Sequence, residues 1–139
     1  MARILLIEDD APLRSLLREL LAVHGHTVTE AGNGREALAL QAAHAFDLLI
    51  LDIVMPEQDG LEVLRTLRTR HAAVKIIAMT GGGRIDGTTL YLTLAGHLGA
   101  HRTLQKPFAS QVLLQTVDEL CPGAGPDRAD AVQDPASGA

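Results

Sequence analysis

The sequence predicts an α/β protein built on a parallel β-sheet with helices on both faces. Short apolar runs alternate along the chain with longer stretches whose leucines recur at helical spacing. Segments of these two kinds, joined by short loops, are typical of βαβ units with right-handed crossovers. The apolar runs are continuous rather than alternating, most clearly at residues 4–7 and 46–51. This pattern is typical of strands that are buried on both faces.

Five strands are expected, and the run at residues 46–51 is the strongest of them. The run at residues 27–31, Thr-Val-Thr-Glu-Ala, is a weaker strand candidate. The expected strands cover residues 4–7, 27–31, 46–51, 74–79 and 100–104.

Helices are expected after each of these strands. The first is capped by Asp10 and has Pro12 in its first turn, where a missing N–H group costs nothing. Its leucines form one stripe, and Gly25 follows its end as a C-cap glycine. The remaining helices are expected from the turn at residues 32–34 to His44, around Leu61, Leu64 and Leu67 after a loop with Pro56, Asp59 and Gly60, between residues 88 and 97, and around residues 112–120.

Composition excludes several classes of protein. Of the 139 residues, 47% are hydrophobic and 21% are charged, which is too apolar for an intrinsically disordered chain. The net charge of −5 argues against direct binding to nucleic acid or to an anionic membrane surface. The single cysteine, Cys121, cannot form an internal disulfide. Because no apolar run approaches the ~20 residues of a membrane span and the first residues lack a signal-peptide design, we expect a cytoplasmic protein.

The composition changes at the C-terminal end of the sequence. Residues 121–139 contain three of the six prolines and one aliphatic residue larger than alanine, Val132. Such a segment buries too little apolar surface to offset its ordering entropy. We therefore expect one folded domain at residues 1–120. A disordered segment rich in Pro, Gly, Ala and Asp follows at residues 121–139, either as a tail or as the remains of a linker.

Acidic residues follow two of the predicted strands. Glu8 and Asp9 come directly after the first strand, and Asp52 comes after the third. Ligand sites in parallel sheets lie beyond the carboxyl ends of the strands. Three carboxylates that converge there repel one another unless a cation joins them. Oxygen ligands suit Mg²⁺ or Mn²⁺, so we expect a site for such an ion. The alternative is that the strands end in acids only because exposed loops are acidic.

Two further polar residues follow predicted strands. Thr80 ends the fourth strand, and Lys106 comes shortly after the fifth. A hydroxyl group and an ammonium group facing a cation-bound carboxylate are what a phosphoryl group requires, since they donate hydrogen bonds to its oxygens and neutralise its charge. Asp52 is the expected nucleophile because it ends the most buried strand.

These residues stand within motifs that cover residues 3 to about 120. The motifs are Ile7-Glu8-Asp9-Asp10 with Arg14 after it, residues 33–38 (Asn-Gly-Arg-Glu-Ala-Leu), residues 52–60 (Asp-Ile-Val-Met-Pro-Glu-Gln-Asp-Gly), Thr80-Gly81, Gly99-Ala100 and Lys106-Pro107-Phe108. In this order and spacing the sequence resembles a receiver domain of a two-component response regulator, of the single-domain, chemotaxis-regulator-like kind. The resemblance implies a doubly wound five-stranded sheet of the flavodoxin-like order 2-1-3-4-5.

The resemblance also implies roles for the acidic residues. Asp52 is similar to the aspartate that takes a phosphoryl group from a phosphohistidine. Glu8 and Asp9 resemble the acidic pair that holds Mg²⁺, with Asp9 the more direct ligand. Asp52 and the backbone carbonyl of Val54 complete this set.

The remaining matches imply a switch. Thr80 and Gly81 resemble the segment that moves to bind the phosphoryl oxygens, and Lys106 resembles the lysine that pairs with them. The peptide bond between Lys106 and Pro107 is similar to one that is cis in the family, where a cis X–Pro bond costs only about 0.5–1 kcal/mol.

The sequence departs from the family pattern at three places. Thr103 stands where the family usually has an aromatic residue, so the usual coupling to Thr80 is in doubt. Residues 81–83 are three glycines, which indicate either a mobile switch segment or a tolerated surface insertion. Val54 and Gly82 supply no acid or amide near the expected attacking water, which predicts slow self-dephosphorylation.

Two other patterns are weak. Residues 82–88 look a little like a phosphate-binding loop but lack its lysine. The six histidines are spread over several elements, and a strand start between His97 and His101 breaks their helical spacing. We expect neither pattern to form a site.

The expected function is a phosphorylatable switch that acts through protein contacts and is not an enzyme. Its partners would be a histidine kinase or histidine phosphotransfer protein and an unidentified effector. The family resemblance allows a homodimer through the fourth helix, fifth strand and fifth helix. Two alternatives are an adaptor that works without phosphorylation and the N-terminal piece of a longer DNA-binding regulator. An aspartyl-phosphate hydrolase would need an acid at position 54, where Val54 stands.

Overall fold

The computed structural model describes residues 2–55, 58–71, 73–80 and 93–122, with the backbone alone at residues 54, 55, 58 and 59. Its main sheet has the strand order β2-β1-β3-β6-β7, and all neighbouring strands are parallel. This confirms the expected order 2-1-3-4-5. The strands are β1 (Arg3–Ile7), β2 (Thr27–Ala31), β3 (Leu48–Asp52), β6 (Lys75–Thr80) and β7 (Arg102–Gln105).

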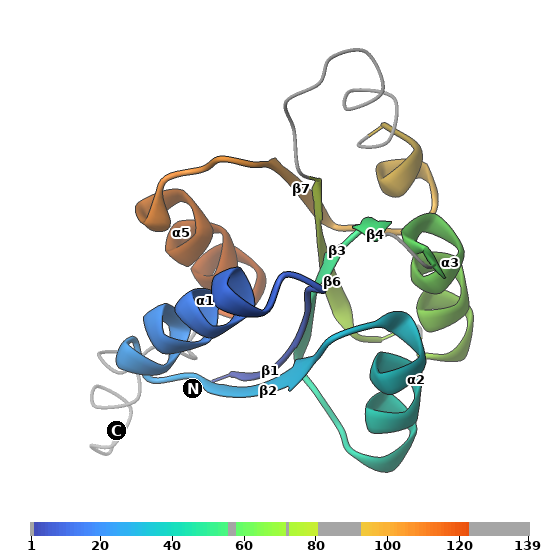
Figure 1. Cartoon of the computed structure of the whole chain (residues 1–139), viewed down its shortest axis with the longest axis horizontal. Coiled ribbons are helices and arrows are strands. Elements are labelled where there is room, and N and C mark those ends of the chain that lie inside the picture. The colour runs from blue at the N-terminus through green and yellow to red at the C-terminus, as the bar shows by residue number, and fades with distance from the viewer. Residues whose placement is uncertain (1, 56–57, 72, 81–92, 123–139) are drawn as a thin grey trace.

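Helices cover both faces of this sheet. In Figure 1, α1 and α5 lie on one side of the sheet, and α2 and α3 lie on the other. Residues 93–97 are also helical, so the described part of the chain contains only the end of the helix expected at residues 88–97. The labelled helices are α1 (Ala11–Val23), α2 (Gly34–Ala43), α3 (Gly60–Arg70) and α5 (Ser110–Leu120).

Two apolar layers explain the continuous apolar runs. Successive side chains of a strand point to opposite faces of its sheet. Ile4 and Leu6 of β1 therefore pack in the layer that contains residues of α1 and α5. Leu5 and Ile7 pack in the layer that contains residues of α2 and α3. All four side chains are fully buried, and each such burial stabilises the fold by about 1.5–3 kcal/mol.

The helix ends follow local rules. Asp10 Oδ1 accepts a hydrogen bond from the Leu13 amide at 3.2 Å, as an N-cap does. Gly25, just beyond α1, has a φ of +93°, a conformation that favours glycine. The cap of α2 was not expected: Asn33 Oδ1 accepts from the Glu36 amide at 2.9 Å, and Glu36 Oε1 accepts from the Gly32 amide at 2.7 Å.

Three boundaries differ from the sequence expectations. The loop expected after Asp52 contains a short antiparallel hairpin, β4 (Val54–Met55) and β5 (Gln58–Asp59). The third strand begins at Leu48 rather than residue 46, because the Arg3 amide bonds to the side chain of Asp47 at 2.8 Å and the ladder with β1 starts at the next pair, Ile4 and Leu48. The last strand begins at Arg102 rather than residue 100, because the Ala100 amide still bonds to the Ala95 carbonyl of the preceding helix.

Residues 81–92 and 123–139 lie outside the described part of the chain. The expectations for the glycine run, for the pattern at residues 82–88 and for most of the C-terminal segment therefore stay predictions. Within the described residues, no helix has both the length and the apolar character needed to cross a membrane.

Gly60 holds the start of α3 against the end of the central strand. A Cβ atom added at Gly60 would overlap the backbone of Ile53, the residue after Asp52. By contrast, a Cβ atom at Gly96, within the helical residues 93–97, would meet no atom within 4 Å. The close approach at Gly60 therefore fixes where Asp52 leaves the sheet.

Gly60→Ala should destabilise the protein, whereas Gly96→Ala should not. The added methyl group at position 60 forces the backbone around Ile53 to move, at a cost of about 1–3 kcal/mol. At position 96 the same change adds helix propensity, worth up to about 1 kcal/mol. Urea denaturation of both variants measures the difference. Equal unfolding free energies for the two variants would contradict the close approach of Gly60 to the Ile53 backbone.

Candidate functional site

Three carboxylates meet at the carboxyl edge of the sheet. The register of β1 and β3 pairs Ile7 with Leu51, so the residues that follow them leave the sheet side by side. Oxygen atoms of Glu8, Asp9 and Asp52 all lie within 4.8 Å of one another. Glu8 and Asp52 are only 1% and 3% exposed, whereas Asp9 is exposed. The structure thus brings together the three acids that the sequence predicted.

Lys106 lies between two of these carboxylates. Its Nζ atom donates to Glu8 Oε1 at 2.7 Å and to Asp52 Oδ2 at 3.2 Å. The backbone places it there, because the Lys106 amide donates to the carbonyl of Thr80 at 2.8 Å. Thr80 is 2% exposed and ends β6, the strand beside β3. Both residues therefore stand at the same edge as the acids.

The charges at this edge are unbalanced. Burial, together with the charge of Asp52, raises the pKa of Glu8 to about 7, although the hydrogen bond from Lys106 opposes the rise. Burial lowers the pKa of Lys106, but the hydrogen bond to Glu8 and the charge of Asp52 outweigh it, so the pKa is raised overall. Among the described residues, the ammonium group of Lys106 bonds to two of the three carboxylates, and a divalent cation would complete the neutralisation.

The donor set fits a hard cation. Both oxygens of Glu8 are already engaged, Oε1 by Lys106 and Oε2 by the Asp10 amide at 3.2 Å. The exposed Asp9 is therefore the most accessible ligand. Oxygen ligands with room for water are what Mg²⁺ and Mn²⁺ take in proteins. Val54, whose carbonyl belongs to the predicted set, begins β4 two residues after Asp52.

The other predicted positions are less engaged with this cluster. Gly81 lies outside the described residues. Thr103 is exposed in β7, opposite Ala78 of β6. The peptide bond between Lys106 and Pro107 is cis. The Nδ1 atom of His101 accepts a hydrogen bond from the Ile76 amide at 3.1 Å, so this histidine is engaged with the sheet.

Sequence reasoning missed the role of Arg14, which it noted only as part of a motif. Arg14 Nη1 donates to the backbone carbonyl of Glu8 at 2.8 Å, and Nε donates to Glu30 Oε1 at 3.0 Å. The two signals in the sequence, an arginine early in a helix and a glutamate within a strand, become a pair only through the packing of α1 against β2.

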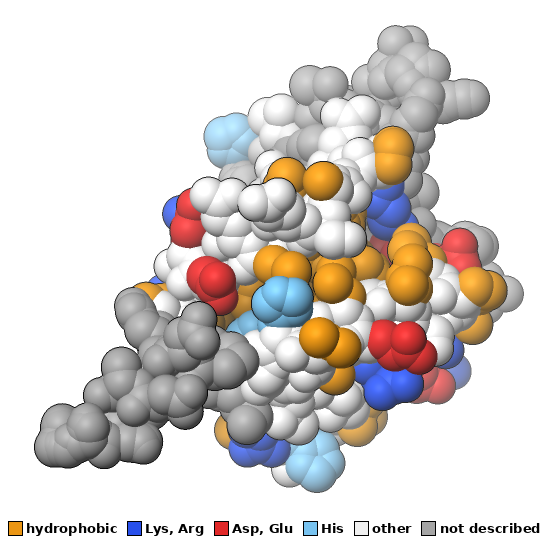
Figure 2. Space-filling model, turned by 90° about the vertical axis from the view of Figure 1, so that its left-hand side faces the viewer, with side chains coloured by type: hydrophobic (Ala, Val, Ile, Leu, Met, Phe, Trp, Pro, Cys, Tyr) orange, Lys and Arg blue, Asp and Glu red, His pale blue; other side chains and the backbone are white. Residues whose placement is uncertain are grey.

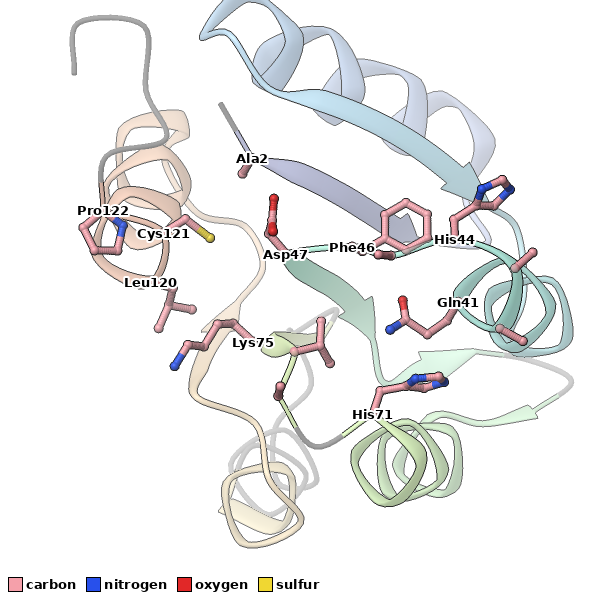
Figure 3. A pocket seen from close by; sticks show the side chains of 15 residues that line it. Ala2, Gln41, His44, Phe46, Asp47, His71, Lys75, Leu120, Cys121 and Pro122 are labelled. Atoms are coloured by element: carbon pink, nitrogen blue, oxygen red, sulfur yellow. The ribbon is translucent and has the colours of Figure 1, made fainter. Parts of the chain in front are cut away.

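A cavity of about 1000 Å³ lies at the opposite, amino-terminal edge of the sheet (Figure 3). Asp47, Lys75 and Cys121 line it, and Gln41 extends toward it from α2. The buried Oε1 atom of Gln41 has no hydrogen-bond partner among the residues that the structure describes. None of the predicted site residues that the structure describes lines this cavity, so the carboxylate cluster remains the candidate site.

The fold and the site define a class of protein: a doubly wound parallel sheet that gathers an acidic cation site and a lysine at its carboxyl edge. Comparison with known proteins narrows this class. The chain matches the family model of the response regulator receiver domain over residues 4–118. The chain therefore belongs to the family of response regulator receiver domains.

Curated relatives are longer than this chain. It is 38% identical over 117 residues to the transcriptional regulatory protein CpxR of Escherichia coli K12, covering 84% of this chain and 48% of that protein. It is also 38% identical over 125 residues to the response regulator MprA of Mycolicibacterium vanbaalenii, covering 90% and 52%. The chain thus spans about half the length of these relatives.

Solved structures of the family share the fold. The response regulator TrrA of Thermotoga maritima, in complex with Mg²⁺ and BeF, aligns with a TM-score of 0.75 at 35% identity, covering 86% of this chain and 99% of that one. The chemotaxis protein CheY4 of Vibrio cholerae aligns with a TM-score of 0.77 at 29% identity, covering 86% and 98%.

Mg²⁺ should stabilise the protein through the carboxylate cluster. At ten times its Kd, an ion that binds only the folded state raises the unfolding free energy by about 1.4 kcal/mol. Asp52→Asn should lose most of this gain, yet unfold at higher urea concentration than the unaltered protein in EDTA, because one of the crowded charges is gone. Asp118→Asn, an exposed change on α5, is the control and should respond as the unaltered protein does. If Mg²⁺ stabilised Asp52→Asn as much as the unaltered protein, the ion would not bind at the carboxylate cluster.

The raised pKa of Glu8 should make the stability of the metal-free protein depend on pH. An acid whose pKa rises from 4.5 to about 7 on folding holds its proton more tightly in the folded state, so stability falls as the pH rises through that range. We expect a loss of about 1–2 kcal/mol between pH 5 and 7.5, after allowance for pairing with Lys106 and for solvent screening. Glu8→Gln should remove most of it. Urea denaturation in EDTA at both pH values measures the loss, and an unchanged pH dependence in the variant would exclude Glu8 as its source.

Proposed function

We propose that this chain is a phosphoacceptor switch. It takes a phosphoryl group onto Asp52, with Mg²⁺, from the phosphohistidine of a histidine kinase or histidine phosphotransfer protein. The observation that carries the proposal is the position of the Asp52 carboxylate. It ends the central strand, almost fully buried, 3.2 Å from the ammonium group of Lys106 and beside two further carboxylates.

Asp52, Lys106 and Thr80 have different roles in the proposed phosphoryl transfer. A carboxylate oxygen of Asp52 attacks phosphorus, the P–N bond to the donor histidine breaks, and its electron pair returns to the imidazole ring. Lys106 then pairs with a phosphoryl oxygen, and the hydroxyl group of Thr80 donates a hydrogen bond to another. Bound Mg²⁺ supplies charge neutralisation at this edge, and the complex of TrrA with Mg²⁺ and BeF supports that choice of ion.

Phosphorylation would redistribute the contacts of Lys106. A phosphoryl group adds about 1.5–2 negative charges and strong acceptor oxygens. Lys106 is drawn away from Glu8 toward these oxygens. Because the Lys106 amide bonds to the Thr80 carbonyl, the ends of β6 and β7 take part in the same rearrangement. This rearrangement is the signal that an effector protein reads.

This chain has an apolar surface next to the site on which a phosphoryl donor protein could dock. A cavity of about 490 Å³ between α1 and the start of α5 is lined by Leu16, Leu20, Phe108 and Lys106 itself, among others. Leu16 is 63% exposed. Figure 2 shows hydrophobic side chains gathered over this face of the molecule. A partner helix that covers these leucines would bring its phosphohistidine to the edge where Lys106 meets Asp52.

The switch is proposed to turn over no substrate. Position 54, where an aspartyl-phosphate hydrolase has its second acid, is Val54. The protein therefore assists only its own phosphorylation and a slow loss of the phosphoryl group.

A second candidate is that the chain acts as the N-terminal receiver of a longer DNA-binding regulator. Its supporting observation is that the chain spans about half of relatives such as the transcriptional regulatory protein CpxR. In that case the switch on Asp52 is the same, and the effector is another part of the same protein.

The protein should gain one phosphoryl group when incubated with Mg²⁺ and phosphoramidate, a small donor with a P–N bond. Intact-mass measurement should show the gain in the unaltered protein and in Asp118→Asn, but not in Asp52→Ala or in EDTA. Lys106→Gln should slow the reaction because the phosphoryl oxygens lose their pairing cation. If folded protein that binds Mg²⁺ gains no phosphoryl group, the adaptor alternative is favoured instead.

A further inference from the structure

The loop that carries the acidic pair is held by an ion-pair network on its outer side. Arg14, in the first turns of α1, donates through Nη1 to the Glu8 carbonyl at 2.8 Å and through Nε to Glu30 Oε1 at 3.0 Å. The other oxygen of Glu30 lies 2.9 Å from Arg18 Nε. The Arg14 and Glu30 side chains are both partly buried, so this ion pair is less screened than one on the open surface.

The carbonyl that Arg14 holds belongs to the peptide between Glu8 and Asp9. Fixing that peptide fixes the direction in which the Asp9 carboxylate leaves the backbone. The Glu8 amide is fixed as well, by the Ala31 carbonyl at 3.1 Å. Because Asp9 is exposed, its position depends on the backbone rather than on packing.

The neighbouring residues leave room for this arrangement. A Cβ atom at Gly32, which follows β2, would lie 3.2 Å from Arg14 Nη1, so one of the two groups would have to shift slightly. Glycine at this position therefore leaves the Arg14 guanidinium group uncrowded where it bonds to the Glu8 carbonyl.

We propose that Arg14, oriented by Glu30, is a positioning residue for the cation site. It holds the Glu8–Asp9 peptide so that Asp9 faces Asp52, and it does not itself touch the ion. The inference rests on the proposed function in that it assumes a divalent cation binds Asp9 and Asp52. It goes beyond that function because it assigns the geometry of the site to a residue outside it.

The positive charge of Arg14 and its proposed positioning role predict opposite effects on divalent-ion affinity when Arg14 is removed. Loss of a cation next to a carboxylate cluster should by itself tighten binding of a divalent ion. Loss of the hydrogen bond that holds the Glu8–Asp9 peptide should weaken it, and residues that orient metal ligands typically contribute 10–100-fold in affinity. Whether the affinity for the divalent ion rises or falls in an Arg14 variant therefore separates the two effects.

The test is a titration with Mn²⁺, with the free ion followed by electron paramagnetic resonance. Arg14→Met should weaken Mn²⁺ binding about tenfold. Arg14→Lys should weaken it similarly, because an ammonium group cannot make both directed bonds of the guanidinium group. Glu30→Gln should give a smaller loss in the same direction. Arg18→Met is the matched control and should bind Mn²⁺ as the unaltered protein does. Arg18 pairs with Glu30, but among the described residues it makes no hydrogen bond to Glu8.

Phosphorylation by phosphoramidate supplies a second readout. The Mg²⁺ concentration that gives half the maximal rate should rise about tenfold in the Arg14 variants, while the rate at saturating Mg²⁺ should stay within about twofold. A general loosening of the fold would also lower the rate at saturating Mg²⁺. Circular dichroism of the metal-free variants checks the fold. If Arg14→Met does not fold, the same Mn²⁺ titrations of Arg14→Lys and Glu30→Gln test the proposal.

Two results would overturn the proposal in different ways. Unaltered protein that binds Mn²⁺, together with Arg14 variants that bind it equally or more tightly, would exclude positioning by Arg14 and leave the proposed function intact. Unaltered, folded protein that binds no Mn²⁺ would exclude the cation site, and the positioning role would fall with it.

Discussion

The mutual repulsion of carboxylates at the carboxyl edge of the sheet is the constraint around which the rest of the structure is arranged. Glu8 and Asp52 are almost fully buried there, and Asp9 stands beside them. Burying like charges is costly unless each is paired. Lys106 pairs with two of them. Burial nevertheless raises the pKa of Glu8, so this pairing offsets only part of the cost.

The parallel sheet is what makes such crowding sustainable. Neighbouring strands in register deliver residues 8 and 52 to adjacent positions. The last strand returns beside β6 and places Lys106 next to Thr80 through a backbone hydrogen bond. Apolar layers on both faces of the sheet hold these strand ends. The rearrangement proposed for the cluster would therefore act on the strand ends, which the packed core beneath supports.

Much of this arrangement could be predicted from the sequence because strand order and strand ends follow from continuous apolar runs. The acids were placed correctly for that reason, and so was Lys106. The hairpin of β4 and β5 was missed because two-residue strands have no periodicity. The pairing of Arg14 with Glu30 was missed because it depends on how α1 packs against β2, and no local pattern contains that distance.

One helix connects the chemistry of the site with the surface that a partner would cover. Asp10 caps α1, Arg14 bonds from its first turns to the Glu8 carbonyl, and Leu16 is exposed on the same helix. These groups lie within two turns of one rigid element. If docking of a partner displaced α1, it would also displace the guanidinium group that is proposed to hold the Glu8–Asp9 peptide. Because the backbone of Glu8 is bonded to α1 as well as to the sheet, the proposed partner contact would act on the geometry of the proposed cation site through this helix.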